Sequence, residues 1–96
     1  MSEALIICDE KKRVGGKIVK VCVKLRDDLV ERVMISGDFF VDPAEKFEEL
    51  LQELSCMRIR KDEVVTVVAE LLKKKELEFS GVTTEDILEV LNKILQ

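Results

Sequence analysis

The feature that most constrains the fold is an alternation of apolar and polar residues in the segment 17–25. The apolar residues occupy every second position: Val19, Val21, Val23 and Leu25. A period of two predicts a β-strand with one buried face, because successive side chains of a strand point to opposite faces. A turn at 26–28 and a second apolar run at 30–35 follow, so the sequence predicts an antiparallel hairpin over 17–35.

One further strand and a well-marked helix follow from similar patterns. Residues 4–8 form a short apolar run that is typical of a strand. A helix over about 43–55 is predicted from its start signal, with Asp42 as cap, Pro43 at the first helical position and Glu45 at the capping-box position. Apolar residues then recur at the spacing of one helix face: Phe47, Leu50, Leu51 and Leu54.

The second half of the chain predicts two more helices. Residues 62–75 fit a helix, although their β-branched run at 64–68 also suits a strand; acidic residues at the front and lysines at the back favour the helix. Thr83 or Thr84 caps a final helix, and a short extended piece at 77–79 stays open. The predicted fold class is α+β: a small antiparallel sheet of about three strands, packed on one face by about three helices, in a single domain over 1–96.

Composition excludes most function classes. The chain has 96 residues, no His, Trp or Tyr, and a net charge of −4. Without His there is no imidazole base, nucleophile partner or metal ligand, so we assign no catalytic residue and no metal site to the chain acting alone. The negative charge argues against nucleic acid as a partner.

The cysteines and the apolar runs bear on the compartment. Cys8, Cys22 and Cys56 are odd in number and irregularly spaced, which predicts free thiols, with Cys22 as a small buried apolar residue, rather than a disulfide framework. Free thiols suit a reducing compartment. No apolar run approaches the ~20 residues of a membrane span, and no leader segment is recognisable, so we expect a cytoplasmic protein without membrane contact.

Charge is distributed in blocks along the chain. Residues 1–24 carry a net charge of +3, residues 25–55 carry −6, residues 56–75 carry +3 and residues 76–96 carry −4. We interpret this pattern as a solvated surface of both signs rather than one binding patch. The segment Gly15-Gly16-Lys17 lacks the spacing of a phosphate-binding loop, and its plainer interpretation is a turn with a solvated lysine.

The segment 36–43 is the strongest candidate for a binding site. If the chain is extended there, the adjacent Phe39 and Phe40 point to opposite faces. Asp38, beside Gly37, can bond neighbouring backbone amides and fix the loop. Two interpretations stay open: both aromatic side chains belong to the core, or one of them is the anchor of a docking loop.

Three stretches carry a resemblance to a known family. Gly15-Gly16-Lys17 with the apolar residues after it, the Gly-Asp-Phe-Phe stretch at 37–40 followed by Pro43 and an acidic amphipathic helix, and Ser80-Gly81-Val82-Thr83 before the last helix are similar to the C-terminal accessory domain of lipoate-protein ligases. The resemblance covers about residues 12–96. Arg26-Asp27-Asp28 departs from it, since the family often has a glycine in this turn, and residues 1–11 match nothing in it.

The resemblance implies a non-catalytic accessory subunit of a two-chain lipoate-protein ligase, as in some archaea. In that family ATP, Mg and lipoate bind mainly in a larger catalytic part, which forms lipoyl-adenylate. The lipoyl group then passes to a lysine of a lipoyl-carrier domain or of the glycine-cleavage H protein. The accessory part is needed for adenylation, shifts position during the cycle, and is much less needed for transfer.

By resemblance, the interface of this heterodimer would include the motif residues Lys17, Gly37, Asp38, Phe39, Phe40 and Pro43. Lys17 would also be placed to approach the phosphates. The alternative is a protein-binding adaptor or regulatory module on the same scaffold, without ligase activation. Activity of the pure chain would instead indicate an independent enzyme.

Overall fold

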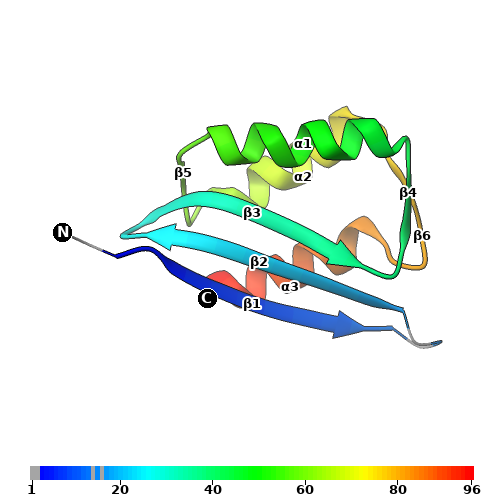
Figure 1. The fold of residues 1–96 in the computed structure, drawn as a ribbon, viewed down its shortest axis with the longest axis horizontal. Helices are drawn as coiled ribbons and strands as arrows, with labels where there is room; N and C mark the ends of the chain where they lie inside the picture. The colour runs from blue at the N-terminus through cyan, green and yellow to red at the C-terminus, as the bar shows by residue number, and fades with distance from the viewer. Residues whose placement is uncertain (1–2, 14, 16) are drawn as a thin grey trace.

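The computed structural model describes residues 3–13, 15 and 17–96. Figure 1 shows the arrangement of the elements. Their order is β1 (Leu5–Lys12), β2 (Ile18–Arg26), β3 (Leu29–Gly37), β4 (Phe40–Asp42), α1 (Ala44–Cys56), β5 (Ile59–Arg60), α2 (Val64–Lys74), β6 (Glu78–Ser80) and α3 (Thr84–Leu95).

The main sheet is antiparallel, with the strand order β1-β2-β3-β5. The alternation in β2 has the predicted consequence: Val19, Val21 and Val23 are fully buried, while Lys20 is exposed. The predicted hairpin is confirmed as β2 and β3, joined by a turn in which Asp27 has a φ of 57°. The first strand is longer than predicted, because its charged half at 9–12 also pairs with β2, at 18–21.

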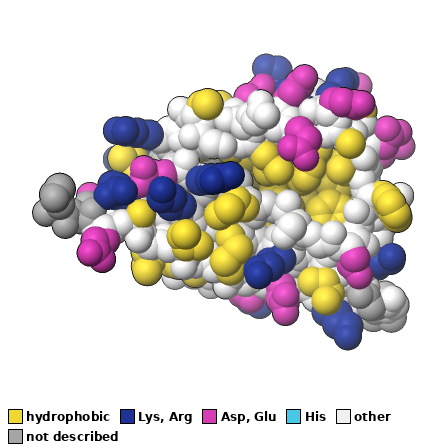
Figure 2. All heavy atoms as spheres, viewed as in Figure 1, with side chains coloured by type: hydrophobic (Ala, Val, Ile, Leu, Met, Phe, Trp, Pro, Cys, Tyr) yellow, Lys and Arg dark blue, Asp and Glu magenta, His cyan; other side chains and the backbone are white. Residues whose placement is uncertain are grey.

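All three helices cover one face of this sheet, so the predicted α+β class is confirmed (Figure 1). α3 packs across β1 and β2, α1 lies along β3, and α2 packs against α3. In the view of Figure 1 α3 lies behind the sheet, so the space-filling view in Figure 2 looks onto the uncovered side. The sheet has four strands instead of about three, because the segment between the first two predicted helices contains β5.

The helix predictions hold with small shifts, except at one cap. α2 is helical despite its β-branched run, because Val64, Val68 and Leu72 fall on one buried face. The prediction of an Asp42 cap with a capping box at Glu45 is wrong: Pro43 is the N-cap residue of α1, and no side chain caps it. Thr83 caps α3, with the complete capping box supplied by Asp86.

A two-stranded ribbon closes one end of the fold. β4 and β6 pair antiparallel, with Val41 opposite Phe79 on the inner side and Phe40 opposite Ser80 on the outer side (Figure 1). The short piece left open near 77–79 is thus β6, at 78–80. The ribbon places the segment after β3 beside the segment before α3, which lie forty residues apart in the chain.

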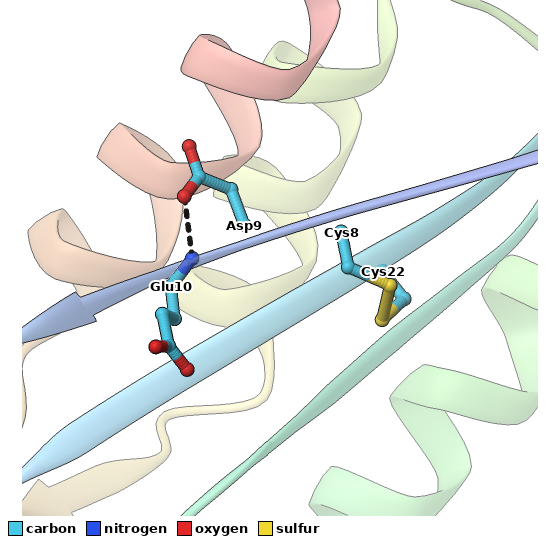
Figure 3. Close-up of a disulfide and its surroundings, with 4 residues drawn as sticks. All are labelled: Cys8, Asp9, Glu10 and Cys22. Atoms are coloured by element: carbon cyan, nitrogen blue, oxygen red, sulfur yellow. Dashed lines mark hydrogen bonds between the residues drawn. A yellow bond between two sulfur atoms is a disulfide. The ribbon is translucent and has the colours of Figure 1, made fainter.

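The prediction of three free thiols is wrong. Cys8 and Cys22 lie directly opposite each other on β1 and β2, 4.1 Å apart at their Cα atoms, and form a disulfide. Figure 3 shows the disulfide and Glu10 on one side of β1 and Asp9 pointing toward α3 on the other. Cys56 is free and exposed. The argument for a reducing compartment therefore keeps only Cys56.

Candidate functional site

The candidate site begins where β3 runs closest to the start of β2. Gly37 has a φ of 153°, and a Cβ atom placed on it would lie 2.1 Å from the backbone oxygen of Ile18. No side chain fits in that space, so only glycine allows the two strands this close approach. The position of Gly37 in the sequence motif therefore has a steric cause.

Asp38 fastens the loop to β2. Its Oδ1 accepts a hydrogen bond from the backbone N–H of Ile18 at 2.6 Å, and its own N–H donates to the carbonyl of Ile18 at 3.2 Å. The side chain of Asp38 accepts a bond from a backbone amide, as predicted, but that amide belongs to another strand and not to a neighbour in the chain. The carboxylate continues the ladder past the end of β3, which holds the next two residues in a defined position.

The two neighbouring aromatic residues have opposite surroundings. The Phe39 ring packs on Phe47 of α1 and Phe79 of β6, with centroid distances of 6.2 and 5.9 Å. Phe47 and Phe79 are in turn 5.8 Å apart in an edge-to-face arrangement, so the three rings form one cluster. Phe40 points the other way and is 76% exposed. The interpretation that places both aromatic side chains in the core is therefore wrong.

Lys17 lies at this end of the molecule, directly before β2 begins at Ile18. Its side-chain stem passes over Gly81, where an added Cβ would lie 3.3 Å from Cγ of the lysine and 3.6 Å from Cβ of Phe39. Lys17 is exposed and forms no ion pair with any residue that the structure describes. It also lines a shallow hollow with Arg13 and Thr83. Gly16 of the predicted turn lies outside the described residues.

The remaining motif residue lies further along. Pro43 is half-buried at the N-terminal end of α1, after β4. The structure thus brings Lys17, Gly37, Asp38 and Phe39 together, with Phe40 on the outside of the same ribbon, and places Pro43 at its far end.

A buried carboxylate that the sequence analysis missed organises the neighbouring segment. Asp86 is 4% exposed and accepts hydrogen bonds from Lys11 at 2.9 Å, Arg13 at 2.6 Å and the backbone N–H of Thr83 at 2.9 Å. Lys11 also bonds Glu89. These bonds attach the end of β1 and Arg13, directly after it, to the start of α3, near Gly81. In the sequence, only the capping box points to Asp86, because Lys11 and Arg13 lie more than seventy residues away from it.

The same contacts set the ionisation of Asp86. Burial alone raises the pKa of a carboxyl group, but the bonds from Lys11, Thr83 and Arg13 favour its charged form. The pKa of Asp86 therefore lies well below its ordinary value of 3.8. The pKa of Lys11 is raised by its bonds to Glu89 and Asp86. Both groups are charged at neutral pH, so Asp86 is a structural anchor and not a proton carrier.

The residues around the Phe40 loop can bind a protein partner, but they offer no obvious catalytic group. An exposed aromatic side chain stands on a loop whose backbone is held by Gly37 and Asp38. The ammonium group of Lys17, which has no ion pair among the described residues, lies nearby. Such a rigid aromatic anchor is typical of protein interfaces. Within the described residues no group of three or more His, Cys, Asp or Glu is placed to hold a metal ion. None of the described helices is long and apolar enough to cross a membrane.

These features define a class: a small α+β protein in which an antiparallel sheet carries helices on one face and an aromatic loop at one end. No protein-family model matches the chain, and no curated protein sequence matches it significantly.

Among solved structures, one chain matches with a TM-score of 0.73 and 19% identity, over 93% of this chain and 97% of that one. Its structure is described as an archaeal lipoylation system, a bi-partite lipoate protein ligase and its E2 lipoyl domain from Thermoplasma acidophilum. At this identity the match shows a shared fold.

Proposed function

We propose that this chain is the non-catalytic accessory subunit of a two-chain lipoate-protein ligase, required for ATP-dependent adenylation of lipoate. The supporting observation is a fold shared almost end to end with a chain from a bi-partite lipoate protein ligase system. The motif residues support the ligase part of that system over its lipoyl domain, because the resemblance in the sequence is to the accessory domain of such ligases.

The chemistry of the chain suits a division of labour. ATP, Mg and lipoate bind in the catalytic subunit, which supplies the groups that this chain lacks. An accessory subunit that closes over an acyl-adenylate excludes water and completes the site, and these tasks need a rigid surface rather than a titratable base. The lipoyl group then passes to a lysine of a lipoyl-carrier domain or of the glycine-cleavage H protein.

The loop end is the docking element in this proposal. Phe40 is the aromatic anchor, because its ring is exposed on a loop that Gly37 and Asp38 hold in place. Phe39 contributes by filling the core beneath. Lys17 lies beside the loop with its ammonium group unpaired among the described residues. From there it reaches toward the phosphates of the adenylate site when the two subunits close.

The proposal is tested by pyrophosphate release from ATP and lipoate. The candidate catalytic subunit is assayed with and without this chain, and this chain alone is the control. Release that requires both chains is the expected result. An unchanged rate, together with separate elution of the two chains from a sizing column, would contradict the proposal.

The second candidate is a protein-binding adaptor on the same scaffold. The observation that favours it is the exposed Phe40, which would serve any protein partner equally well. A stable complex with the catalytic subunit in which pyrophosphate release is unchanged would favour this function over activation.

A further inference from the structure

The side of the main sheet that the helices leave uncovered carries a net positive charge. Four cross-strand rows of side chains point away from the helices, and they contain four cations: Lys12, Lys20, Lys24 and Arg32. Glu10 is the one carboxylate in these rows, so their net charge is +3. The whole chain carries −4, so the rest of the molecule is strongly acidic. Figure 2 shows dark blue side chains among yellow ones on this side.

The cations of the two sides differ in their partners. On the helix side, Lys11 and Arg13 are held by Asp86, and Lys93 of α3 lies 3.6 Å from Asp9. On the uncovered side, none of the four cations forms an ion pair with any residue that the structure describes. The next row of this side, beyond Lys24 and Arg32, differs from the four. There Arg26 is bonded to Glu31, and Arg60 lies 3.5 Å from Asp62. The unpaired cations are thus confined to the four rows nearer the Phe40 loop.

The uncovered side is also partly apolar at its centre. Ile6 is 59% exposed and lies in the row of Lys24 and Arg32, and the next row contains the disulfide and Met34. No aromatic residue belongs to these rows, so the side lacks the stacking platforms that single-stranded nucleic acid requires. Together with the net charge of −4, this composition favours a protein partner over a polyanion.

The area of this side, and its continuity with the Phe40 loop, indicate which protein would cover it. Three strands about 4.8 Å apart, eight or nine residues long, present roughly 400 Å². One side of a stable interface buries about 800 Å², so the Phe40 loop alone is too small and needs an adjoining surface. The two surfaces meet at Ile18, whose backbone bonds Asp38 and which pairs with Lys12 in the last row.

We propose that this open face docks onto the catalytic subunit, at a surface of that subunit that presents carboxylates around a small apolar centre. The inference rests on the proposed function and extends it from the loop to the sheet. An interface rich in charge and poor in apolar area forms quickly and releases readily. Such a contact suits a subunit that must close for adenylation and then move away from the reacting centre.

The test compares two variants of equal charge. Lys20, Lys24 and Arg32 are reversed together in K20E/K24E/R32E. The matched control K46E/K61E/K74E reverses three exposed lysines on the helix side and in loops. Affinity for the catalytic subunit is measured by titration from low to high salt, with pyrophosphate release at saturating accessory chain as a second readout. Far-ultraviolet circular dichroism checks folding, and the neutral variant K24Q/R32Q serves if the triple variant does not fold.

The open-face variant is expected to raise Kd at least about tenfold at low salt, because several exposed ion pairs across the interface become repulsive. K24Q/R32Q raises Kd in the same direction by a smaller factor. High salt weakens wild-type binding and removes most of the difference. Pyrophosphate release returns at saturating concentration, and the control binds like the wild type.

Three results would overturn this inference while leaving the proposed function standing. The open-face variant binds like the wild type, or the control weakens binding equally, or the variant changes only the KM for the lipoyl-accepting protein in transfer from preformed adenylate. The third result would assign the open face to the acceptor. Failure of the wild-type chain to stimulate pyrophosphate release would overturn the proposed function, and this inference with it.

Discussion

Two pairs of identical neighbours, Phe39 and Phe40 and Lys11 and Lys12, mark the inner and outer sides of this molecule. Phe39 lies in a cluster of three rings, whereas Phe40 has no aromatic partner and is 76% exposed. Lys11 is held by Asp86 and Glu89, whereas Lys12 forms no ion pair with a described residue. Extended backbone separates the members of each pair, since successive side chains of an extended chain face opposite sides.

The comparison separates stability from recognition. An inner side chain has its partners within the chain, so its replacement lowers the free energy of unfolding. An outer side chain of the same type makes few contacts in the free protein, so its replacement affects mainly binding to a partner. Substitutions of inner residues should therefore lower stability, and those of outer residues should lower binding to the partner.

Gly37→Ala is expected to destabilise the protein most. The new Cβ would lie 2.1 Å from the Ile18 oxygen at a φ of 153°, so the ends of β2 and β3 must separate. We expect a loss of about 4 kcal/mol, measured by urea unfolding. Gly15→Ala is the control: its φ is 99°, but no atom lies within 4 Å of its added Cβ, so about 1 kcal/mol is expected. Equal losses would show that steric closure at Gly37 is unimportant.

Asp86→Asn is expected to cost about 3 kcal/mol at neutral pH, because Lys11 and Arg13 lose a buried counter-charge. The folded-state pKa of Asp86 is lowered, so its stabilisation is complete above the ordinary value of 3.8 and is lost as pH falls through the folded value. The difference between wild type and variant, from urea unfolding at several pH values, should therefore shrink in acid below about pH 4. A pH-independent difference would contradict the ionic role. Glu10→Gln, on the outer side, should change stability little.

Phe39→Ala is expected to cost about 2 kcal/mol, less than a fully buried phenylalanine, because the ring is half-buried. The loss arises from a cavity between Phe47 and Phe79. Thermal melting of the variant measures it, and Phe39→Leu should recover part of the stability. A melting temperature unchanged from wild type would show that Phe39, like Phe40, does not contribute to stability, and it would contradict the distinction between the two residues.

Local patterns were sufficient for most of the fold. The alternation at Val19, Val21 and Val23, the amphipathic helices and the opposite directions of Phe39 and Phe40 all follow from the period of a strand or helix. Each depends on residues a few positions apart, so the chemistry of neighbours decides it.

The features that escaped prediction depend on strand register. The disulfide requires Cys8 to lie opposite Cys22, the β4–β6 ribbon requires Phe40 to lie opposite Ser80, and Asp86 finds its cations on a strand at the other end of the chain. The basic open face has the same origin. Blocks of charge along the sequence average over both sides of a strand, and only the register shows that Lys20 and Arg32 share a side.

Phe40→Ala is the change expected to affect stability least and activation most. Because the ring is 76% exposed, its removal should change the free energy of unfolding by less than about 0.5 kcal/mol. Binding to the catalytic subunit should weaken by about 2 kcal/mol if the ring is an interface anchor, which is roughly a thirtyfold rise in Kd. Titration of the catalytic subunit measures that rise, with pyrophosphate release as the functional readout.

The matched substitution at Phe39 makes this last measurement decisive. Phe39→Ala should lower the melting temperature but activate normally wherever it is folded, since the ring faces Phe47 and Phe79. Phe40→Ala should melt normally and activate poorly. If Phe40→Ala instead binds and activates like the wild type, the loop end is not the anchor. The partner would then have to be held by the open face of the sheet alone, whose roughly 400 Å² is about half of what one side of a stable interface buries.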